Sequence, residues 1–420
     1  MLNLIGVILA FIVIIILIRK KFNFGLSLFT GSLIVGVFSL QVISPIDIPI
    51  AIIEASIYSF AKQQIMTETA ELALLMTLIF ILAKAMQETR AITKLIDSLR
   101  TFFSKGGILG VIPAVYGLMP VPGGALFSAP LVDKEGDKYE LQKDQKNFLN
   151  IWFRHIWFPI YPISSAMILL CSIKFSGIPF EMLILADLPA FIGVLLIGFI
   201  YLTRFTRKIP RPTGTIKREY HGLIYILPPV VPLLFYPLIF IGLSETRCFI
   251  IGVFFSLLLL YFLIHIDSKT YLTIIKKSFT WNLAFAIFGI MILREMIKTS
   301  QMHLFITETM QNLAFPALLV VILIPFLLGI LTGYNLGAIA LSYPLVDPFF
   351  TFTGIHIIGL TSLIFMSSLI GYLISPIHLC NVLSSEYLKT DTTRMYKMFI
   401  PAAFTLLLIQ TLFVIIVFPA

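Results

Sequence analysis

The sequence carries little charge. Only 12% of its 420 residues are Asp, Glu, Lys or Arg, whereas 59% are hydrophobic and the mean hydropathy is +1.00. This composition lies outside the range of soluble globular domains and predicts that lipid surrounds most of the chain. Long polar segments are also lacking, since the two longest, 133–146 and 204–221, are too short to bury a core of their own. We therefore expect loops rather than an extramembrane domain.

Cysteine and the motifs of common enzymes are scarce as well. The three cysteines, Cys171, Cys248 and Cys380, show neither pairing nor metal-ligand spacing, so we interpret them as small hydrophobic residues. The sequence has no HExxH, phosphate-binding loop or GxSxG motif, which argues against an intramembrane protease and an ATP-driven pump. We expect no enzymatic activity and no cofactor. The basic residues are spread over many loops without forming a stripe, which argues against nucleic-acid binding.

Apolar runs long enough to cross a bilayer are abundant. Hydropathy predicts about ten transmembrane helices of roughly 20 residues each. They lie near 2–18, 24–44, 70–87, 146–170, 182–203, 222–242, 248–265, 280–298, 356–388 and 399–418. Three segments of mixed polarity are predicted to lie as interfacial helices in the headgroup plane, namely 46–66, 89–104 and 299–313.

Four apolar segments carry Pro or Gly where a straight span would break. The stretches 106–132 and 315–346 are too long for loops, and we interpret them as re-entrant helical hairpins. The spans 146–170 and 356–388 are predicted to be broken helices. The expected fold class is therefore an all-α integral membrane protein with two hairpins and two broken helices.

The positions of the basic residues predict the orientation of the chain. Most of the 30 lysines and arginines fall in six connecting segments, which the positive-inside rule places in the cytoplasm. These segments are 19–21, 90–105, 134–146, 204–218, 269–277 and 389–397. Both termini of this multi-pass protein of the cell (cytoplasmic) membrane are then expected outside. The first apolar run lacks a basic leader and a small-residue cleavage site, so we interpret it as a span rather than a signal peptide.

An internal repeat relates the two halves of the chain. When Gly123 is placed on Gly337, GGALFSAPLVD lies over GAIALSYPLVD, and Pro162 falls on Pro376 without a gap. Matches between apolar residues often arise by chance in such a hydrophobic chain, but matches of Gly, Ser, Pro and Asp are much less frequent by chance. We therefore predict two repeats, 1–214 and 215–420. An odd number of spans separates the hairpins, so they should enter the membrane from opposite sides, as in secondary transporters with inverted repeats.

The chemistry of the expected site follows from the ends of broken helices. Inside a membrane every free backbone N–H or C=O needs a partner. Helix N-termini at the two hairpin tips and the two breaks favour an anion, whereas opposing C-termini and unwound carbonyls favour a cation such as Na⁺. A substrate is expected where the four interruptions converge.

In its inverted halves, hairpins and broken spans, the chain resembles the ion-transporter superfamily over nearly its whole length. That superfamily includes divalent-anion/sodium symporters, gluconate and lactate permeases, citrate carriers and some sodium/proton antiporters. The sequence is most similar to a prokaryotic group of ten-span membrane proteins marked by PVPGGALFSAPLVD at 120–133. The resemblance implies elevator-like transport, substrate and ion sites at the hairpin tips and breaks, and a homodimer as a common assembly. The chain lacks the Ser-Asn-Thr tip motif of divalent-anion symporters, which leaves dicarboxylate specificity and Na⁺ coupling open.

The residues expected to bind substrate or ion lie at these tips and breaks, together with one arginine inside a span. They are Pro122, Gly123, Gly124, Ser128, Ser164, Ser165, Asn335, Gly337, Ser342, His378, Asn381 and Arg154. Each has a simpler alternative. Arg154 can form a structural ion pair or extend its side chain to the interface, and Ser128 and Ser342 can hydrogen-bond to nearby backbone. His155 is interpreted as a packing residue and Asp187 as an interfacial one.

We therefore expect a secondary active transporter, a symporter or exchanger of a small organic anion such as a carboxylate, coupled to H⁺ or Na⁺. No metal site is predicted apart from Na⁺ at the hairpin tips. The expected partners are the small anionic solute, the lipid bilayer and a second copy of the chain. A sodium/proton antiporter is the alternative within transport, but it needs a carboxylate deep in the membrane, and few acids occur in the spans. A membrane scaffold or enzyme that moves no solute is the alternative from another class.

Overall fold

The computed structural model describes residues 2–60, 62–103, 106–118, 123–207, 220–301, 316–390 and 392–420. Within this part of the chain, eight helical segments are long and apolar enough to cross a membrane. They are Leu2–Arg19, Glu68–Glu88, Phe180–Thr206, His221–Ile241, Glu245–Ile264, Ser268–Thr299, Ile357–Leu388 and Thr392–Val417. Three shorter apolar helices accompany them, Phe24–Phe38, Ile108–Gly117 and Ala317–Thr332. The prediction of an all-α membrane protein is confirmed.

The described residues of the first half fold as ten helices and one very short β-hairpin. Its elements are α1 Leu2–Arg19, α2 Phe24–Phe38, α3 Asp47–Ser56, β1 Tyr58–Ser59, β2 Gln64–Ile65, α4 Glu68–Glu88, α5 Ala91–Leu99, α6 Ile108–Gly117, α7 Ala125–Asp137, α8 Lys143–Arg154, α9 Ser165–Cys171 and α10 Phe180–Thr206. The interfacial helix predicted over 46–66 is wrong in its second part, where Tyr58 pairs with Ile65 and Ser59 with Gln64 in antiparallel register. Polar residues and a left-handed Gln63 favour a turn there over a helix.

The second half is likewise helical. Its elements are η1 His221–Ile226, α11 Leu227–Leu234, η2 Tyr236–Ile241, α12 Glu245–Ile264, α13 Ser268–Ser278, α14 Trp281–Thr299, α16 Ala317–Thr332, α17 Asn335–Val346, η3 Asp347–Phe352, α18 Ile357–Ile374, α19 Leu379–Leu388 and α20 Thr392–Val417. The span predicted over 222–242 is divided into three pieces, since its prolines cannot donate helical hydrogen bonds. Most of the interfacial segment predicted over 299–313 lies outside the described residues.

The segment 269–277, predicted as a loop, forms most of helix α13. Asp267 begins this helix by accepting a hydrogen bond from the Thr270 amide at 2.8 Å. Hydrogen bonds from Thr270 also hold the pKa of the exposed Asp267 carboxyl below its usual value. The cap explains how a segment with several charged residues still folds as a helix.

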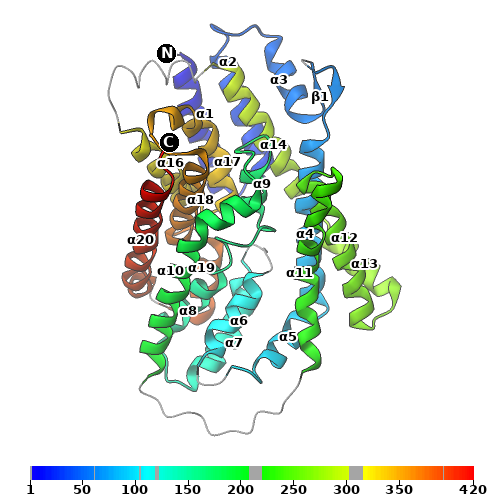
Figure 1. Ribbon diagram of the computed structural model, residues 1–420, viewed down its shortest axis with the longest axis vertical. Helices are drawn as coiled ribbons and strands as arrows, with labels where there is room; N and C mark the ends of the chain where they lie inside the picture. Colours follow the sequence, from blue (N-terminus) through cyan, green and yellow to red (C-terminus); the bar gives the residue numbers. More distant parts are fainter. Residues whose placement is uncertain are drawn as a thin grey trace.

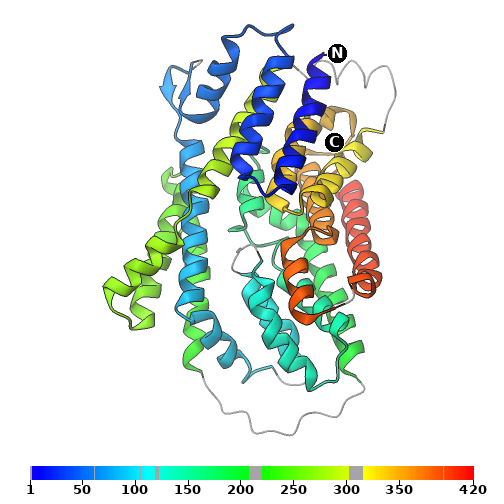
Figure 2. The same ribbon diagram turned by 180° about the vertical axis from the view of Figure 1, so that it is seen from behind.

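The two predicted hairpins are helix pairs that reach into the molecule from opposite ends. Helices α6 and α7 lie in the lower half of Figure 1, and α16 and α17 lie in the upper half near both chain termini. The reverse view in Figure 2 shows the same arrangement. Each hairpin precedes an interrupted helix, α8–α9 in the first half and α18–α19 in the second. The division into two repeats and the side of the membrane on which the termini lie stay predictions.

Two glycines let the second hairpin pack directly on the backbone of α18. A Cβ atom added at Gly371 would lie 2.0 Å from the Phe326 carbonyl oxygen, and one added at Gly329 would lie 2.5 Å from the Ser368 carbonyl oxygen. Small residues at helix contacts permit this close approach in membranes. Helix α18 therefore fixes the position of the hairpin whose tip precedes Asn335.

Replacing Gly371 by alanine should force α16 and α18 apart. We expect Gly371→Ala to destabilise the protein by about 1–3 kcal/mol, as overpacking does in closely packed interiors. Thermal unfolding in detergent measures the effect. Gly36→Ala is the matched control, because its added methyl meets only the flexible side chains of Ile48 and Met296 at 3.1 Å. Equal melting temperatures for the two variants would contradict the close packing of α16 on α18 at Gly371.

Candidate functional site

One cavity of about 380 Å³ takes residues from both hairpin tips and both helix breaks. The first half contributes Gly123 at one tip and the segments 154–155 and 164–166 at the α8–α9 break. The second half contributes 332–336 at the other tip and 377–380 at the α18–α19 break. Helices α4, α14 and α18 supply the remaining wall through Met76, Ile79, Phe80, Leu283 and Tyr372, together with Phe158 from the first break. The four interruptions thus meet at a single cavity.

Three helices begin at this cavity without a side-chain cap. Helix α7 begins after Gly124, α17 after Tyr334 and α19 after His378, and none of these residues accepts a hydrogen bond from the first turn through its side chain. Helix α9 differs, because the Ser164 hydroxyl accepts from the Met167 amide at 3.3 Å. Uncapped N-termini present amide N–H groups and partial positive charge. The cavity is therefore electrostatically suited to an anion.

Arg154 adds a full positive charge to the same place. Its side chain is buried at the end of α8, where Nη1 donates to the Tyr116 carbonyl at 2.8 Å. A Cβ at Gly124 would lie only 2.1 Å from Nη2, so a glycine is needed for the guanidinium to lie against the α7 N-terminus. Among the described lining residues none is Asp or Glu. A buried cation in such surroundings favours a negatively charged ligand.

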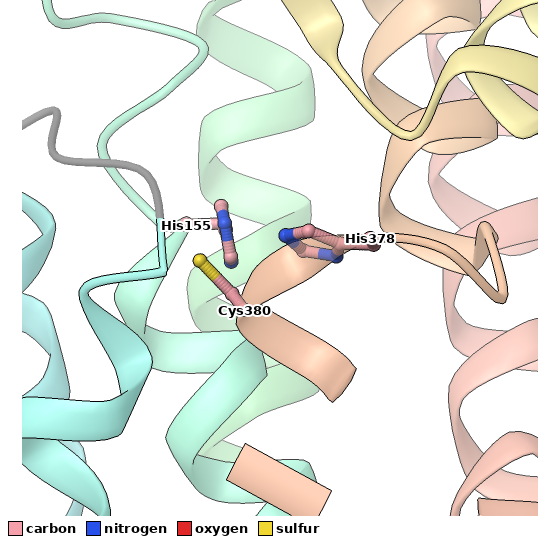
Figure 3. A group of neighbouring side chains, drawn as sticks. All are labelled: His155, His378 and Cys380. Atoms are coloured by element: carbon pink, nitrogen blue, oxygen red, sulfur yellow. The ribbon is translucent and has the colours of Figure 1, made fainter. Parts of the chain in front are cut away.

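Two histidines and a cysteine converge on one side of the cavity. His155, His378 and Cys380 are all buried, and their ligand atoms lie within 4.8 Å of one another (Figure 3). They come from the end of α8 and the start of α19. The His155 and His378 ring centroids are 5.0 Å apart, and Tyr372 packs against both rings. Sequence reasoning missed Cys380 and interpreted His155 as a packing residue.

Asn335 presents a polar group that nothing in the described structure satisfies. Its Oδ1 atom accepts from the Ser368 hydroxyl at 2.9 Å, whereas the buried Nδ2 atom has no hydrogen-bond partner among the described residues. The residue opens α17 and lines the cavity. A buried donor without a partner costs free energy, so a bound acceptor would be favoured there.

The cavity contains six of the twelve residues predicted to form the site. These six are Gly123, Arg154, Ser164, Ser165, Asn335 and His378. Gly124 lies beside the cavity under Arg154. Pro122 lies outside the described residues. The other four predicted residues, Ser128, Gly337, Ser342 and Asn381, do not line the cavity.

Those four residues have packing or hydrogen-bonding roles. Gly337 lies inside α17, where an added Cβ would meet the Phe24 ring at 3.1 Å. Ser342 is buried and donates to the Ile339 carbonyl at 3.4 Å. Asn381 donates to the Tyr396 hydroxyl at 2.8 Å. Ser128 donates to Asn150 Oδ1 at 2.6 Å.

Asn150 is the centre of a buried polar network that joins the first hairpin to α19. Its Nδ2 atom donates to the Ala125 carbonyl at 3.0 Å and to the Ser384 hydroxyl at 2.8 Å, in addition to the bond from Ser128. Ser384 in turn donates to Asn147 Oδ1 at 2.5 Å. The network joins the first turn of α7 to the middle of α19, and thereby holds together two helices whose N-terminal ends lie at the cavity.

The interfacial interpretation of Asp187 is wrong. The residue is fully buried on α10, where Oδ1 accepts from the Ser362 hydroxyl at 2.6 Å. Its Oδ2 atom has no hydrogen-bond partner among the described residues. Gln410 on α20 completes the group by donating to Ser362 Oγ at 2.7 Å. The position in sequence, near a predicted span end, gave no sign of this because α18 and α20 cover the residue.

A second cavity of about 710 Å³ lies between α4 and α13. Lys84, Lys269 and Lys277 line it together with Glu88, so its charge is mainly positive. Phe80 lines both cavities and therefore stands between them.

One family model matches the chain over nearly its whole length. The model of the family described as "Protein of unknown function (DUF401)" matches residues 2–416, so the chain belongs to this family. No curated protein matches the chain.

Removing the Asn150 side chain should lower the free energy of unfolding, because buried hydrogen bonds are lost. We expect Asn150→Ala to cost about 1–3 kcal/mol, since Ser128, Ser384 and the Ala125 carbonyl would lose a buried partner. Thermal unfolding in detergent is the measurement. Asn282→Ala is the matched control, because Asn282 Oδ1 accepts a hydrogen bond from Asn23 Nδ2 at an exposed site. Its replacement should change the free energy of unfolding by no more than about 0.5 kcal/mol. An equally mild effect at both positions would exclude a structural role for the network.

Proposed function

We propose that this member of the DUF401 family is a secondary active transporter of a small organic anion, with the central cavity as its substrate site. The observation that supports this most directly is the meeting of three uncapped helix N-termini with the buried Arg154. Each N-terminus favours a negative charge by about 0.3–1 kcal/mol even at exposed sites, and the effect is larger in a buried one. A cation would find no carboxylate among the described lining residues.

The cavity favours a carboxylate that carries a short apolar body. Its amide N–H groups, Arg154 and the orphaned Asn335 amide are donors for carboxylate oxygens. Phe80, Phe158 and Leu283 add apolar surface to the lining of the same cavity. At about 380 Å³ the space is at the lower end of the range for small-molecule sites. A small monocarboxylate fits these constraints better than a large or strongly polar solute.

The second cavity, between α4 and α13, supports a route by which an anion would reach the central cavity. Lys84, Lys269 and Lys277 raise the local concentration of anions at a place separated from the central cavity by Phe80. Two hairpins that enter from opposite ends provide the elements for alternating access, as in other transporters with inverted repeats. The similarity to the ion-transporter superfamily adds elevator-like movement to the proposal. A static scaffold would have no use for two hairpin tips and two helix breaks that meet around one cavity.

Asp187 supports a role for a coupling ion. A bare carboxylate buried among apolar helices costs several kcal/mol, so a proton on Asp187 or a cation beside it would stabilise the structure. Helix α18 carries both Ser362, which contacts Asp187, and Tyr372, which lines the central cavity. Ten residues of helix separate the two, about 15 Å. Occupancy at Asp187 can thus be transmitted to the cavity through one rigid helix.

The same observation favours a second candidate function, a sodium/proton antiporter. Such a transporter requires an acidic group within a span, and Asp187 is a fully buried carboxylate on α10, one of the candidate membrane spans. The anion transporter remains the better-supported proposal, because the central cavity has cationic rather than anionic chemistry. The two functions differ in which solute stabilises the purified protein.

Anion binding should depend on Arg154. In a thermal-shift screen of the detergent-purified protein, we expect one class of small carboxylate to stabilise it by about 2.7 kcal/mol at 100 times its Kd. Arg154→Gln should weaken that affinity on the order of 100-fold, about 3 kcal/mol, because a charged hydrogen-bond donor is lost. Arg294→Gln is the control, since Arg294 lies in another span beside Glu295 and away from the cavity. Uptake of the same anion into proteoliposomes completes the test. If no anion raised the melting temperature and none were taken up into proteoliposomes, the proposal would be refuted.

Replacing Asp187 by asparagine separates the two candidate functions. For the anion transporter we expect Asp187→Asn to bind the carboxylate while losing the dependence of uptake on pH or Na⁺, because the neutral amide cannot exchange a proton or hold a cation. For the antiporter, Na⁺ and pH alone should shift the melting temperature of the wild type, and the variant should lose that shift. Ser362→Ala serves as the control that retains the carboxylate. Unchanged pH and Na⁺ dependence in Asp187→Asn would remove Asp187 from both mechanisms.

A further inference from the structure

The central cavity has a feature that anion binding does not use, namely a set of soft metal ligands. His155, His378 and Cys380 place two imidazoles and one thiol within 4.8 Å of one another in a buried site. In Figure 3 the Cys380 sulfur lies beside the His155 ring, and His378 approaches from the opposite side. Imidazole and thiolate together are the ligands that Zn²⁺ prefers in proteins.

The hydrogen bond at His155 orients this ring as metal-binding histidines are oriented. Its Nδ1 atom lies 2.7 Å from the Ile151 carbonyl oxygen, which can only accept, so Nδ1 carries the proton. The lone pair of the neutral ring is then on Nε2, where the Tyr372 hydroxyl lies at 3.3 Å. A backbone carbonyl bonded to the second ring nitrogen is the usual way a protein fixes the tautomer of a zinc ligand.

His378 gives the second and independent observation. It is 1% exposed, and neither ring nitrogen has a hydrogen-bond partner among the described residues. A buried imidazole without partners loses the free energy of its hydration and gains nothing in return. A ligand on one nitrogen removes that cost. The residue also opens α19, so its position is fixed by the helix start rather than by a flexible loop.

The distances are compatible with a tetrahedral ion after small adjustments. Ligand atoms around tetrahedral Zn²⁺ lie about 3.3–3.6 Å apart, as follows from Zn–N and Zn–S bond lengths of about 2.0–2.3 Å. Closing the present set from 4.8 Å requires side-chain shifts of about 1 Å or less. Three protein ligands leave a fourth position, and all three residues line the cavity. Sites of this kind keep that position for water or substrate.

We propose that His155, His378 and Cys380 bind one Zn²⁺ ion, or a transition-metal ion of similar softness, with its fourth coordination position open to the central cavity. Binding releases the thiol proton of Cys380, so that the thiolate bonds to the ion. The site does not depend on the proposed anion transport, because the metal can be tested without any solute.

The test uses full-length protein purified in detergent and freed of metal with a chelator. Adding Co²⁺ should produce the near-ultraviolet thiolate charge-transfer band and the intense visible bands of a tetrahedral site, and Zn²⁺ should displace them. Cys380→Ser should abolish the charge-transfer band, and His378→Ala should weaken Co²⁺ binding by more than about 100-fold, since even second-shell changes cost 10–100-fold. Cys171→Ser and Cys248→Ser are matched controls, because both cysteines are buried, free and absent from the cavity.

A measurement on the wild type protects the test against misfolded variants. A small thiol reagent should modify Cys380 through the cavity, and Zn²⁺ should block this reaction by more than tenfold without changing the labelling of Cys171 or Cys248, as read by peptide mass spectrometry. Absence of the charge-transfer band in the wild type, or its persistence in Cys380→Ser, would overturn the proposal. Equal labelling of Cys380 with and without Zn²⁺ would do the same. Loss of anion uptake alone would bear only on the transport proposal.

Discussion

An unpaired backbone amide inside a bilayer costs several kcal/mol, and the centre of this molecule is arranged around that cost. The chain interrupts its helices at two hairpin tips and two breaks, and all four interruptions border one cavity. At the α9 start the chain supplies its own acceptor through Ser164. At the α7, α17 and α19 starts it supplies no side-chain cap. These uncapped ends border the cavity, where the proposed anion would accept hydrogen bonds from their free amides.

The uncapped ends can act together only because other contacts hold them in place. The Asn150 network connects α7 and α19, and close glycine packing fixes α16 on α18. Arg154 has a double role, since it bonds to the Tyr116 carbonyl of the first hairpin and also faces the cavity. Precise positioning of donors lowers the cost of reorganisation when a ligand binds. Most buried polar residues in this region therefore support the site from outside it.

The parts of the fold that follow from local signals were predictable from sequence. Apolar length identified the spans, and Pro and Gly identified the breaks, because both act within a few residues. The surroundings of Asp187 and Cys380 could not be predicted from such local signals. Asp187 acquires its environment from Ser362 and Gln410, and Cys380 acquires its neighbour from His155, all far away in sequence. Nothing local marks such partners.

The internal repeat illustrates a related limit. It pairs Gly123 with Gly337, but Gly123 has a φ of +70° before α7, whereas Gly337 lies within α17. At the tip of the second hairpin, the left-handed glycine before α17 is Gly333, with a φ of +60°. A sequence match transfers residue identity, but each half sets its helix start by its own packing, here the contact of Gly337 with Phe24. Gly123 and Gly337, which the repeat aligns, therefore have different structural roles.

Charge balance would allow one cavity to bind both the proposed anion and the proposed metal ion. A divalent ion bound to one thiolate keeps a net positive charge, and Arg154 adds another. Two positive centres in a buried space without a carboxylate among its described lining residues repel each other unless an anion lies between them. A carboxylate that bonds to Arg154 and also fills the open coordination position would neutralise both. The two proposed ligands then strengthen each other's binding, and by thermodynamic linkage each must do so by the same factor.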